Sequence, residues 1–342
     1  MPPDTPLVVG EETAVLAFLA DPVSYPGRPD RVDSIETHMS RVFLAGDRVY
    51  KLKKPVRFSF VDFTTLEARR RNCERELALN QRLAPDVYLA VQPLVRGPRG
   101  RLAFGGDGEI VEWLVVMRRL EPTRLLDQAL VAGTVTPADV DALCDRLAKF
   151  YAQAARLPWS PEQWVTHWHR LVALSEDSLT DPVFGLAEAP VVALLGGLWR
   201  FLEEEAALLH ERVAAGRIVD GHGDLRPEHV HLGPPLRVID RLEFDERLRW
   251  SDPFDEASFL AVECERLGNG WVGPRLIDGL ADRLGERPPR RLLGFYRGYR
   301  AALRARLSIE HLRDPAPREP ARWPRQARTY LDIGLAAIAD QS

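Results

Sequence analysis

One segment, residues 218–244, constrains the fold more than any other part of this 342-residue chain; it reads IVDGHGDLRPEHVHLGPPLRVIDRLEF. The glycines on both sides of His222, together with Pro227, predict a sharply bent loop rather than a regular strand or helix. Residues 229–232 and 236–240 are predicted to be short strands joined by a Gly-Pro-Pro turn. Paired as a hairpin, these strands place His229 opposite Ile239, one residue from Asp240.

Three polar side chains converge from this short stretch: Asp224, His229 and Asp240. Carboxylates that meet in a glycine-shaped loop suit divalent-metal binding and general-base chemistry. A metal-dependent hydrolase that uses His222, Asp224, His229 and His231 is one possible interpretation. No further histidine-rich segment completes its metal site, so this interpretation ranks low.

The rest of the chain changes character near residue 120. Before it, a short helix (11–19) and a Pro/Gly-rich connector precede strand-like runs at 41–44 and 48–52, a long helical pattern at 65–83 and strands at 88–94 and 110–117. Gly105–Gly108 predicts a hairpin turn. Seven helical segments follow, interrupted only by the segment 218–244: 136–156, 161–174, 189–213, 251–266, 273–284, 289–309 and 320–339. The fold class is therefore α+β, with a small antiparallel β-lobe that carries one long helix and a larger, mostly helical lobe.

Composition excludes several classes of function. The net charge is −4, so no basic field favours nucleic acid or an anionic membrane as partner. The odd number of well-separated cysteines (Cys73, Cys144 and Cys264) suits a reducing compartment and small core side chains. No basic N-terminal region or long apolar run predicts a signal peptide or membrane helix, so we expect a cytoplasmic protein. Its oligomeric state is open.

Lysine is scarce and clustered. Of the 46 basic residues only four are lysine, and three of these lie within four positions: Lys51, Lys53 and Lys54, with Lys149 alone further on. Lys51 and Lys53 leave the predicted strand on one face. Lys54 is expected at the surface.

A resemblance to a known family links these features. His222-Gly223-Asp224, a polar residue five positions after the aspartate, and a strand ending in Val-Ile-Asp resemble the H-G-D-x-x-x-x-N … I-D pattern of the aminoglycoside-phosphotransferase-like kinases. These form the small-molecule branch of the protein-kinase-like fold. Residues 36–43, 50–55 and 73–77 are similar to one bacterial subgroup, whose longer members carry a C-terminal P-loop ATPase domain. No G-x-x-x-x-G-K-[ST] run occurs in this sequence.

The resemblance implies a bilobal fold and a set of site residues. The domains would be an N-terminal extension (1–30), a nucleotide-binding lobe (31–118) and a catalytic lobe (119–342). Residues implied to bind ATP are Lys51, with Lys53 as the alternative, its partner Glu76, Ser40 in the turn over the phosphates, and Met117 and Arg119 at the hinge. Asp224 would be the catalytic base or orient the acceptor, and Asp240 would bind the metal. Asp255 is implied to brace the catalytic loop, whose shape His222 would maintain.

Two departures from the family pattern matter. The turn 37–40 lacks the glycines of a G-x-G-x-x-G loop, so backbone N–H groups and Ser40 would contact phosphate. His229 replaces the asparagine metal ligand. Mg²⁺ prefers oxygen, whereas imidazole suits Mn²⁺, so His229 either ligates a metal of shifted preference or marks the loss of one metal position.

The predicted function is an ATP-dependent kinase that phosphorylates a hydroxyl of a small molecule. Its partners are then the nucleotide, with Mg²⁺ or Mn²⁺, and the small-molecule substrate. The alternative is a nucleotide-binding pseudokinase, motivated by His229. Arg297, Arg300 and Arg304 form a stripe on one helix face. An ion-paired or solvated face is the ordinary interpretation of this stripe. An anion-binding wall is the functional one, and it argues against a polycationic aminoglycoside as acceptor.

Overall fold

The computed structural model describes residues 9–58, 61–314 and 316–339. The first eight residues of the expected N-terminal extension, residues 59, 60 and 315, and the last three residues of the expected catalytic lobe lie outside this part. The chain divides into two compact units. One comprises Met1–Arg124 with Arg237–Glu246, and the other comprises Leu125–Leu236 with Arg247–Ser342.

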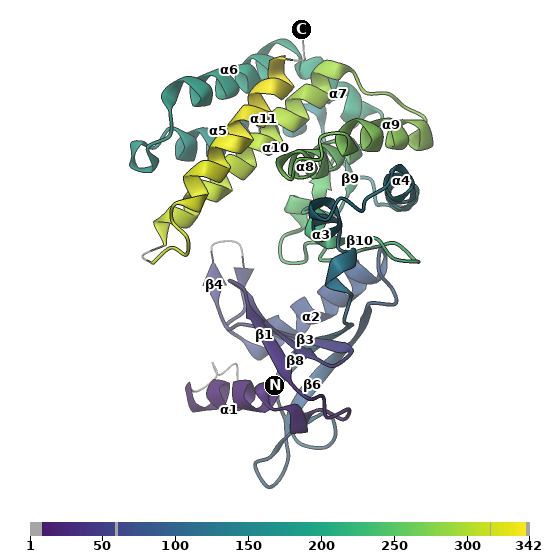
Figure 1. The fold of residues 1–342 in the computed structure, drawn as a ribbon, viewed down its shortest axis with the longest axis vertical. Helices are drawn as coiled ribbons and strands as arrows, with labels where there is room; N and C mark the ends of the chain where they lie inside the picture. The colour runs from purple at the N-terminus through teal and green to yellow at the C-terminus, as the bar shows by residue number, and fades with distance from the viewer. Residues whose placement is uncertain (1–8, 59–60, 315, 340–342) are drawn as a thin grey trace. The chain divides into compact units, whose positions relative to one another are not determined.

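The first unit is built on a six-stranded antiparallel sheet with the order β1-β2-β3-β8-β6-β7 (Figure 1). Its strands are β1 (Val32–Glu36), β2 (Ser40–Ala45), β3 (Arg48–Lys53), β6 (Tyr88–Arg96), β7 (Leu102–Phe104) and β8 (Glu109–Arg118). A small ladder pairs β4 (Arg57–Phe58) with β5 (Val61–Asp62). Two helices complete the unit: α1 (Val9–Ala20) and α2 (Leu66–Gln81).

The central strand β3 has an apolar face and a charged face, because successive side chains of a strand point in opposite directions. Leu52 belongs to a buried cluster with Val15 of α1. Lys51, on the other face, reaches Glu76 of α2. The two helices therefore lie on opposite faces of β3, and the charged face is the one that α2 covers.

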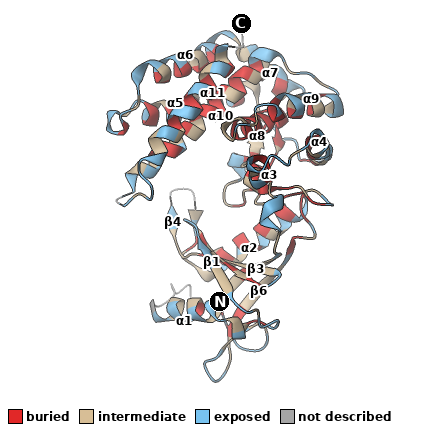
Figure 2. Ribbon diagram, viewed as in Figure 1, coloured by how far each residue is buried: buried red, intermediate tan, exposed pale blue. Residues whose placement is uncertain are grey.

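The second unit is mostly helical. Its helices are α3 (Leu126–Val131), α4 (Pro137–Ala152), α5 (Pro161–Leu179), α6 (Glu188–Glu204), α7 (Ala206–Ala214), α8 (Pro253–Arg266), α9 (Val272–Leu284), α10 (Arg290–Glu310) and α11 (Arg322–Ala339). Side-chain caps begin several of them: Thr136 and Ser160 form capping boxes with residues three positions on, and Asp252 caps α8. Helix α8 is buried along nearly its whole length, as Figure 2 shows. Among helices it packs against α9, α10 and α11.

The fold class predicted from the sequence is confirmed, and three local predictions are wrong. The Gly105–Gly108 turn does not close a hairpin: β7 pairs with β6, and the turn leads to β8, which pairs with the other edge of β6. The helix expected at 189–213 is two helices that meet at Glu205. His229 ends a 3₁₀ turn (Pro227–His229) that begins at a proline, and β10 is only Val230–His231.

Short strands flank the bent loop. In the second unit β9 (Val219–Asp220) pairs with β12 (Trp250–Ser251). Strand β11 (Arg237–Val238) lies in the segment Arg237–Glu246, which belongs to the first unit. Within the described residues, no helix has both the length and the apolar character that a membrane crossing requires.

Candidate active site

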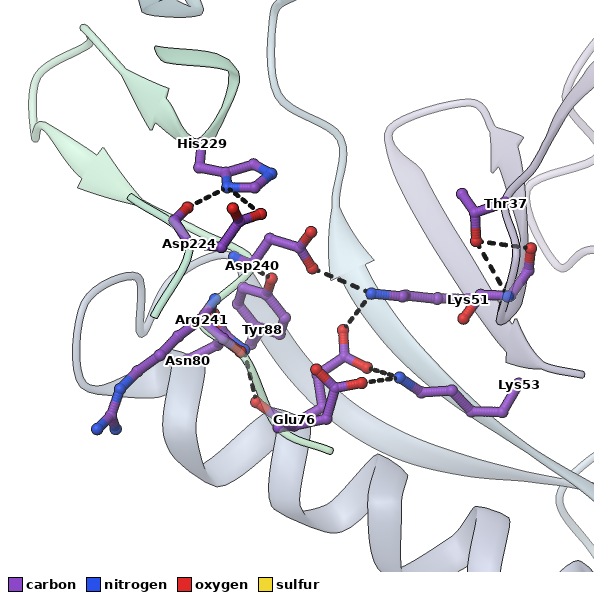
Figure 3. A network of polar contacts seen from close by, with 12 residues as sticks. Thr37, Lys51, Lys53, Glu76, Asn80, Tyr88, Asp224, His229, Asp240 and Arg241 are labelled. Atoms are coloured by element: carbon purple, nitrogen blue, oxygen red, sulfur yellow. Dashed lines mark hydrogen bonds and ion pairs between the residues drawn. The ribbon is translucent and has the colours of Figure 1, made fainter. Parts of the chain in front are cut away.

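Lys51 occupies the centre of the charged face of the first unit. Its strand position lies opposite Val42 on β2 and Val115 on β8, so the side chain is held by a fully paired strand. The ammonium Nζ lies 2.8 Å from Oε1 of Glu76 and 3.1 Å from Oδ1 of Asp240 (Figure 3). Burial alone lowers the pKa of Lys51, but the carboxylates around it, Asp240 foremost, raise that pKa well above its ordinary value. Lys51 is therefore a permanent cation.

Glu76 is presented by the buried face of α2, whose first turn is capped by the side chain of Thr65. Its carboxylate has no solvent exposure and meets two lysines, Lys51 at Oε1 and Lys53 at Oε2. Burial raises the pKa of Glu76, but the two ammonium groups together lower it by more, so that the net shift is downward. The Lys51–Glu76 pairing expected from the sequence is present, and Lys53 joins it.

Asp240 is held in place by its backbone. It has a positive φ of 60°, a conformation that is rare for residues other than glycine. Its N–H donates to the hydroxyl of Tyr88 at 3.0 Å. The next residue, Arg241, exchanges two hydrogen bonds with the side chain of Asn80 on α2, at 2.8 and 3.3 Å. The Asp240 side chain is 43% exposed, in contrast to the buried groups behind it.

Lys53 is the deeper of the two lysines on this face. Its side chain is 1% exposed, and its Nζ lies 2.5 Å from both Glu76 Oε2 and Glu243 Oε1. Glu243 follows Asp240 by three residues and is a site residue that the sequence analysis missed. Lys54 pairs with Glu36 at 2.8 Å in a more exposed position.

The remaining predicted nucleotide-binding residues also lie in the first unit. Ser40 is buried, and its N–H donates to the Thr37 hydroxyl at 3.0 Å, which closes the turn between β1 and β2. Met117 lies near the end of β8, opposite Val49 on β3. Just beyond β8, the N–H of Arg119 donates to the Asp47 carbonyl at 2.9 Å.

In the second unit, Glu256 holds the bent loop that carries Asp224. Its buried carboxylate accepts the backbone N–H of His222 at 2.9 Å and that of Gly223 at 2.5 Å, and also the hydroxyl of Tyr151 at 2.8 Å. A Cβ on Gly221 would lie 2.6 Å from the same carboxylate, so only glycine fits there.

The prediction that Asp255 braces this loop is wrong. Asp255 accepts two hydrogen bonds from Arg300, at 2.7 and 2.6 Å, and the adjacent acid Glu256 contacts the loop instead. The two acids occupy neighbouring positions in the first turn of α8, and the rotation of that helix decides which one faces the loop.

Asp224 is partly exposed and ion-paired. Its Oδ2 lies 2.9 Å from Nη2 of Arg226, whose Nη1 also lies 2.7 Å from Glu228. The backbone N–H of Asp224 donates to Nδ1 of His222 at 3.2 Å. His222 therefore shapes the loop, as expected from the sequence.

His229 packs against the same loop. Its Nδ1 lies 2.8 Å from the backbone carbonyl of Asp224 and 3.7 Å from Oδ2 of that residue (Figure 3). Because a carbonyl only accepts, this contact identifies Nδ1 as the protonated nitrogen. Nε2 lies 3.5 Å from the guanidinium of Arg226. His229 therefore lies in the 3₁₀ turn and not on the strand predicted at 229–232, whereas His231 does lie on a strand.

The arginine stripe on α10 is ion-paired throughout. Its three members contact three carboxylates, at 2.8, 2.6 and 2.5 Å respectively: Arg297 with Glu265, Arg300 with Asp255 and Arg304 with Glu263. The ordinary interpretation is correct, and the anion-binding wall is not. The three cysteines are buried and unpaired by disulfides, as expected. Within residues 9–58, 61–314 and 316–339, no group of three or more His, Cys, Asp or Glu side chains has metal-binding geometry.

Comparison with known sequences gives relatives without an assigned activity. No protein-family model matches the chain. Uncharacterized proteins of Mycobacterium bovis and Mycobacterium tuberculosis are 35% identical over 297 residues. The alignment covers 85% of this chain and 57% of those proteins, so the chain spans little more than half of their length.

Solved structures identify the fold. A choline/ethanolamine kinase family protein from Mesorhizobium loti matches with a TM-score of 0.53 at 15% identity, over 95% of this chain and 99% of that chain. A choline kinase from Cryptosporidium parvum matches with a TM-score of 0.53 at 9% identity, over 94% of each chain. An aminoglycoside 2′-phosphotransferase with GDP matches with a TM-score of 0.50 at 17% identity, over 94% and 97%. The chain therefore has the protein-kinase-like fold that small-molecule kinases share.

Proposed function

We propose that the chain is a phosphotransferase that uses ATP and a divalent cation to phosphorylate a hydroxyl group of a small molecule. The observation that carries the proposal is Lys51, a permanent cation held between buried Glu76 and exposed Asp240. A strand lysine paired with a helix glutamate is the phosphate-binding arrangement of protein kinases. The greater length of the mycobacterial relatives supports placing the chain in the expected bacterial subgroup.

The residues of the first unit fit a metal–nucleotide complex. Asp240 offers the hard oxygen ligand that Mg²⁺ prefers, and its side chain is more exposed than those of Lys51 and Glu76. Lys51, 3.1 Å from that carboxylate, offers a charge for phosphate. When bound, ATP would supply the transferable phosphoryl group, and the magnesium ion would offset the negative charge of its phosphates. We assign Ser40 and its turn to phosphate contact, and Met117 and Arg119 to the nucleotide base.

Asp224 is assigned to the acceptor hydroxyl. Its ion pair with Arg226 fixes the orientation of the carboxylate. Phosphoryl transfer through a loose transition state needs positioning more than a strong base. Asp224 therefore holds the hydroxyl in line and accepts its proton as transfer proceeds.

His229 supports this loop. Its Nδ1–H is committed to the Asp224 carbonyl, and its Nε2 faces the Arg226 guanidinium, so a cation already occupies the direction in which a metal would bind. We propose that Asp240 is the metal ligand, that His229 positions Asp224, and that Mg²⁺ serves without a shift in metal preference.

Calorimetry with ATP and Mg²⁺, followed by phosphate transfer assays, tests the proposal. Since the arginine stripe is neutralised, it no longer argues against a cationic acceptor, so the panel includes choline, ethanolamine and aminoglycosides beside neutral and anionic metabolites. Asp224→Asn should keep nucleotide affinity and lower transfer by about 100-fold or more. Absence of nucleotide binding by the wild-type protein would refute the proposal that the chain is a kinase.

A nucleotide-binding module without transfer is the second candidate. It is favoured by the His229 contacts, which leave no second metal ligand of the usual kind in the loop. Tight ATP binding with no transfer to any acceptor of the panel would favour this candidate.

A further inference from the structure

We propose that Lys53 and Glu243 are positioning residues that hold Glu76 against Lys51 from behind. The inference rests on the proposed function, since the group they position is the phosphate-binding lysine. It concerns one cluster of five ionisable side chains in the first unit, called here the paired-lysine cluster: Lys51, Lys53, Glu76, Asp240 and Glu243.

The cluster is a chain of contacts that runs from the exposed side inward. Asp240 contacts Lys51, and Lys51 contacts Oε1 of Glu76, as Figure 3 shows; the two distances are 3.1 and 2.8 Å. Oε2 of the same carboxylate contacts Lys53, which contacts Glu243, and both distances are 2.5 Å. Glu76 therefore has one cation on each oxygen. A single lysine–glutamate pair would leave the second oxygen of a fully buried carboxylate without a charged partner.

Exposure falls from Asp240 and Lys51 to the three inner side chains. The side chains of Lys53, Glu76 and Glu243 are 1%, 0% and 6% exposed, whereas Lys51 is 15% and Asp240 43% exposed. Two lysines face three carboxylates, so the five side chains together carry one net negative charge. Asp240, the most exposed of them, is the member that a cation from solvent can reach.

The inner pair matters most when phosphate competes for Lys51. As the ammonium turns toward a bound phosphate, its contact with Glu76 weakens. With Lys53 in place, Glu76 keeps a charged partner, stays ionised and holds its side-chain conformation. Without Lys53, two buried carboxylates, Glu76 and Glu243, would depend on Lys51 alone.

A purely structural role would have a different signature. Buried ion pairs can often be replaced by apolar side chains of similar volume without loss of stability, while removal of one partner alone strands a buried charge. The double variant Lys53→Met/Glu243→Met removes both partners and keeps the volume. The single variant Lys53→Met strands Glu243 and is expected to unfold more readily.

The scarcity of lysine makes a direct readout possible. In the double variant only Lys51, Lys54 and Lys149 remain. Acylation by a small amine-reactive reagent, followed by peptide mass spectrometry, measures each lysine separately, with exposed Lys149 as internal reference. The control variant is Lys54→Met, which makes the same change one residue away in a more exposed pair with Glu36.

We expect the double variant to unfold close to the wild-type temperature and to acylate Lys51 several-fold faster, because Glu76, no longer held at its second oxygen, leaves the Lys51 ammonium more accessible to the reagent. Its kcat should fall by about 10- to 100-fold because Lys51 is misplaced. The control should leave the acylation of Lys51 unchanged. Acylation of Lys51 within about twofold of wild type in the folded double variant would overturn the inference. This readout needs no nucleotide, so it decides the positioning role even if the kinase proposal fails.

Discussion

The carboxylate of Glu256 lies 2.5 Å from the backbone nitrogen of Gly223, one residue before Asp224. This contact joins the buried helix α8 to the loop that carries the proposed catalytic aspartate. A single side chain thus fixes the path of the loop, because the same carboxylate also accepts the N–H of His222.

Glu256→Ala should therefore destabilise the protein by about 2–4 kcal/mol, since two buried N–H groups lose their acceptor. Urea unfolding measures the change. Glu265→Ala is the matched control on α8: that glutamate makes a half-exposed pair with Arg297 and should cost at most about 1 kcal/mol. Equal losses in the two variants would contradict the bracing role.

Lys51→Arg should lower kcat/KM by about 100-fold, because the planar guanidinium does not fit a point-charge position between two carboxylates and a phosphate. Lys149→Arg, on the exposed side of α4, should leave kcat/KM unchanged. Steady-state kinetics on both variants checks the prediction. If Lys149→Arg were as damaging as Lys51→Arg, the assignment of the phosphate lysine would be wrong.

Asp240→Gly should separate backbone strain from charge. Glycine adopts a φ of 60° without steric cost, so this variant should be more stable than Asp240→Ala by about 1 kcal/mol. Both variants should lose the magnesium dependence of ATP affinity. Thermal unfolding and calorimetry with and without Mg²⁺ provide the two measurements, and a magnesium-dependent affinity that survives in either variant would remove Asp240 from the metal site.

The stability of the second unit should fall in mild acid because of His167 on α5. Burial, with smaller effects from Arg170 and Arg300, lowers the pKa of His167 to about 4. The unfolded chain takes up this proton near pH 6.5, whereas the folded chain does not. The stabilising contribution is therefore complete above pH 6.5 and is lost as the pH falls toward 4.

His167→Phe should reduce this loss by roughly 2 kcal/mol between pH 7 and 5. Urea unfolding at the two pH values measures it, with His169→Phe on the same helix as control. An unchanged pH dependence in His167→Phe would show that another group is responsible.

The sequence was sufficient to predict the fold class and most of the groups that form the candidate site, because the glycines and proline around Asp224 and the position of Lys51 on a strand are local signals. Pairings between distant residues were harder to predict. Asp255 and Glu256 differ by one position on α8, and the sequence does not show the rotation of the helix. Pro227 indicated a bent loop, but the 3₁₀ turn at His229 was not predicted, because the β-branched and apolar residues after it favoured a strand.

Glu243 illustrates the same limit. It follows Asp240 in a run of charged and apolar residues with no pattern of its own, and only the fold places it 2.5 Å from Lys53. The arginines of α10 likewise show their common face in the sequence, whereas their carboxylate partners lie on another helix.

The segment Arg237–Glu246 belongs to the first unit although more than a hundred residues of the other unit separate it from Arg124. Each unit is therefore formed by two separate segments of the sequence. A fragment ending at Arg124 would contain Lys51, Lys53 and Glu76 but neither Asp240 nor Glu243, and would bury two ammonium groups against one carboxylate. To study the first unit alone, its last ten residues must be rejoined to Arg124 through a designed linker.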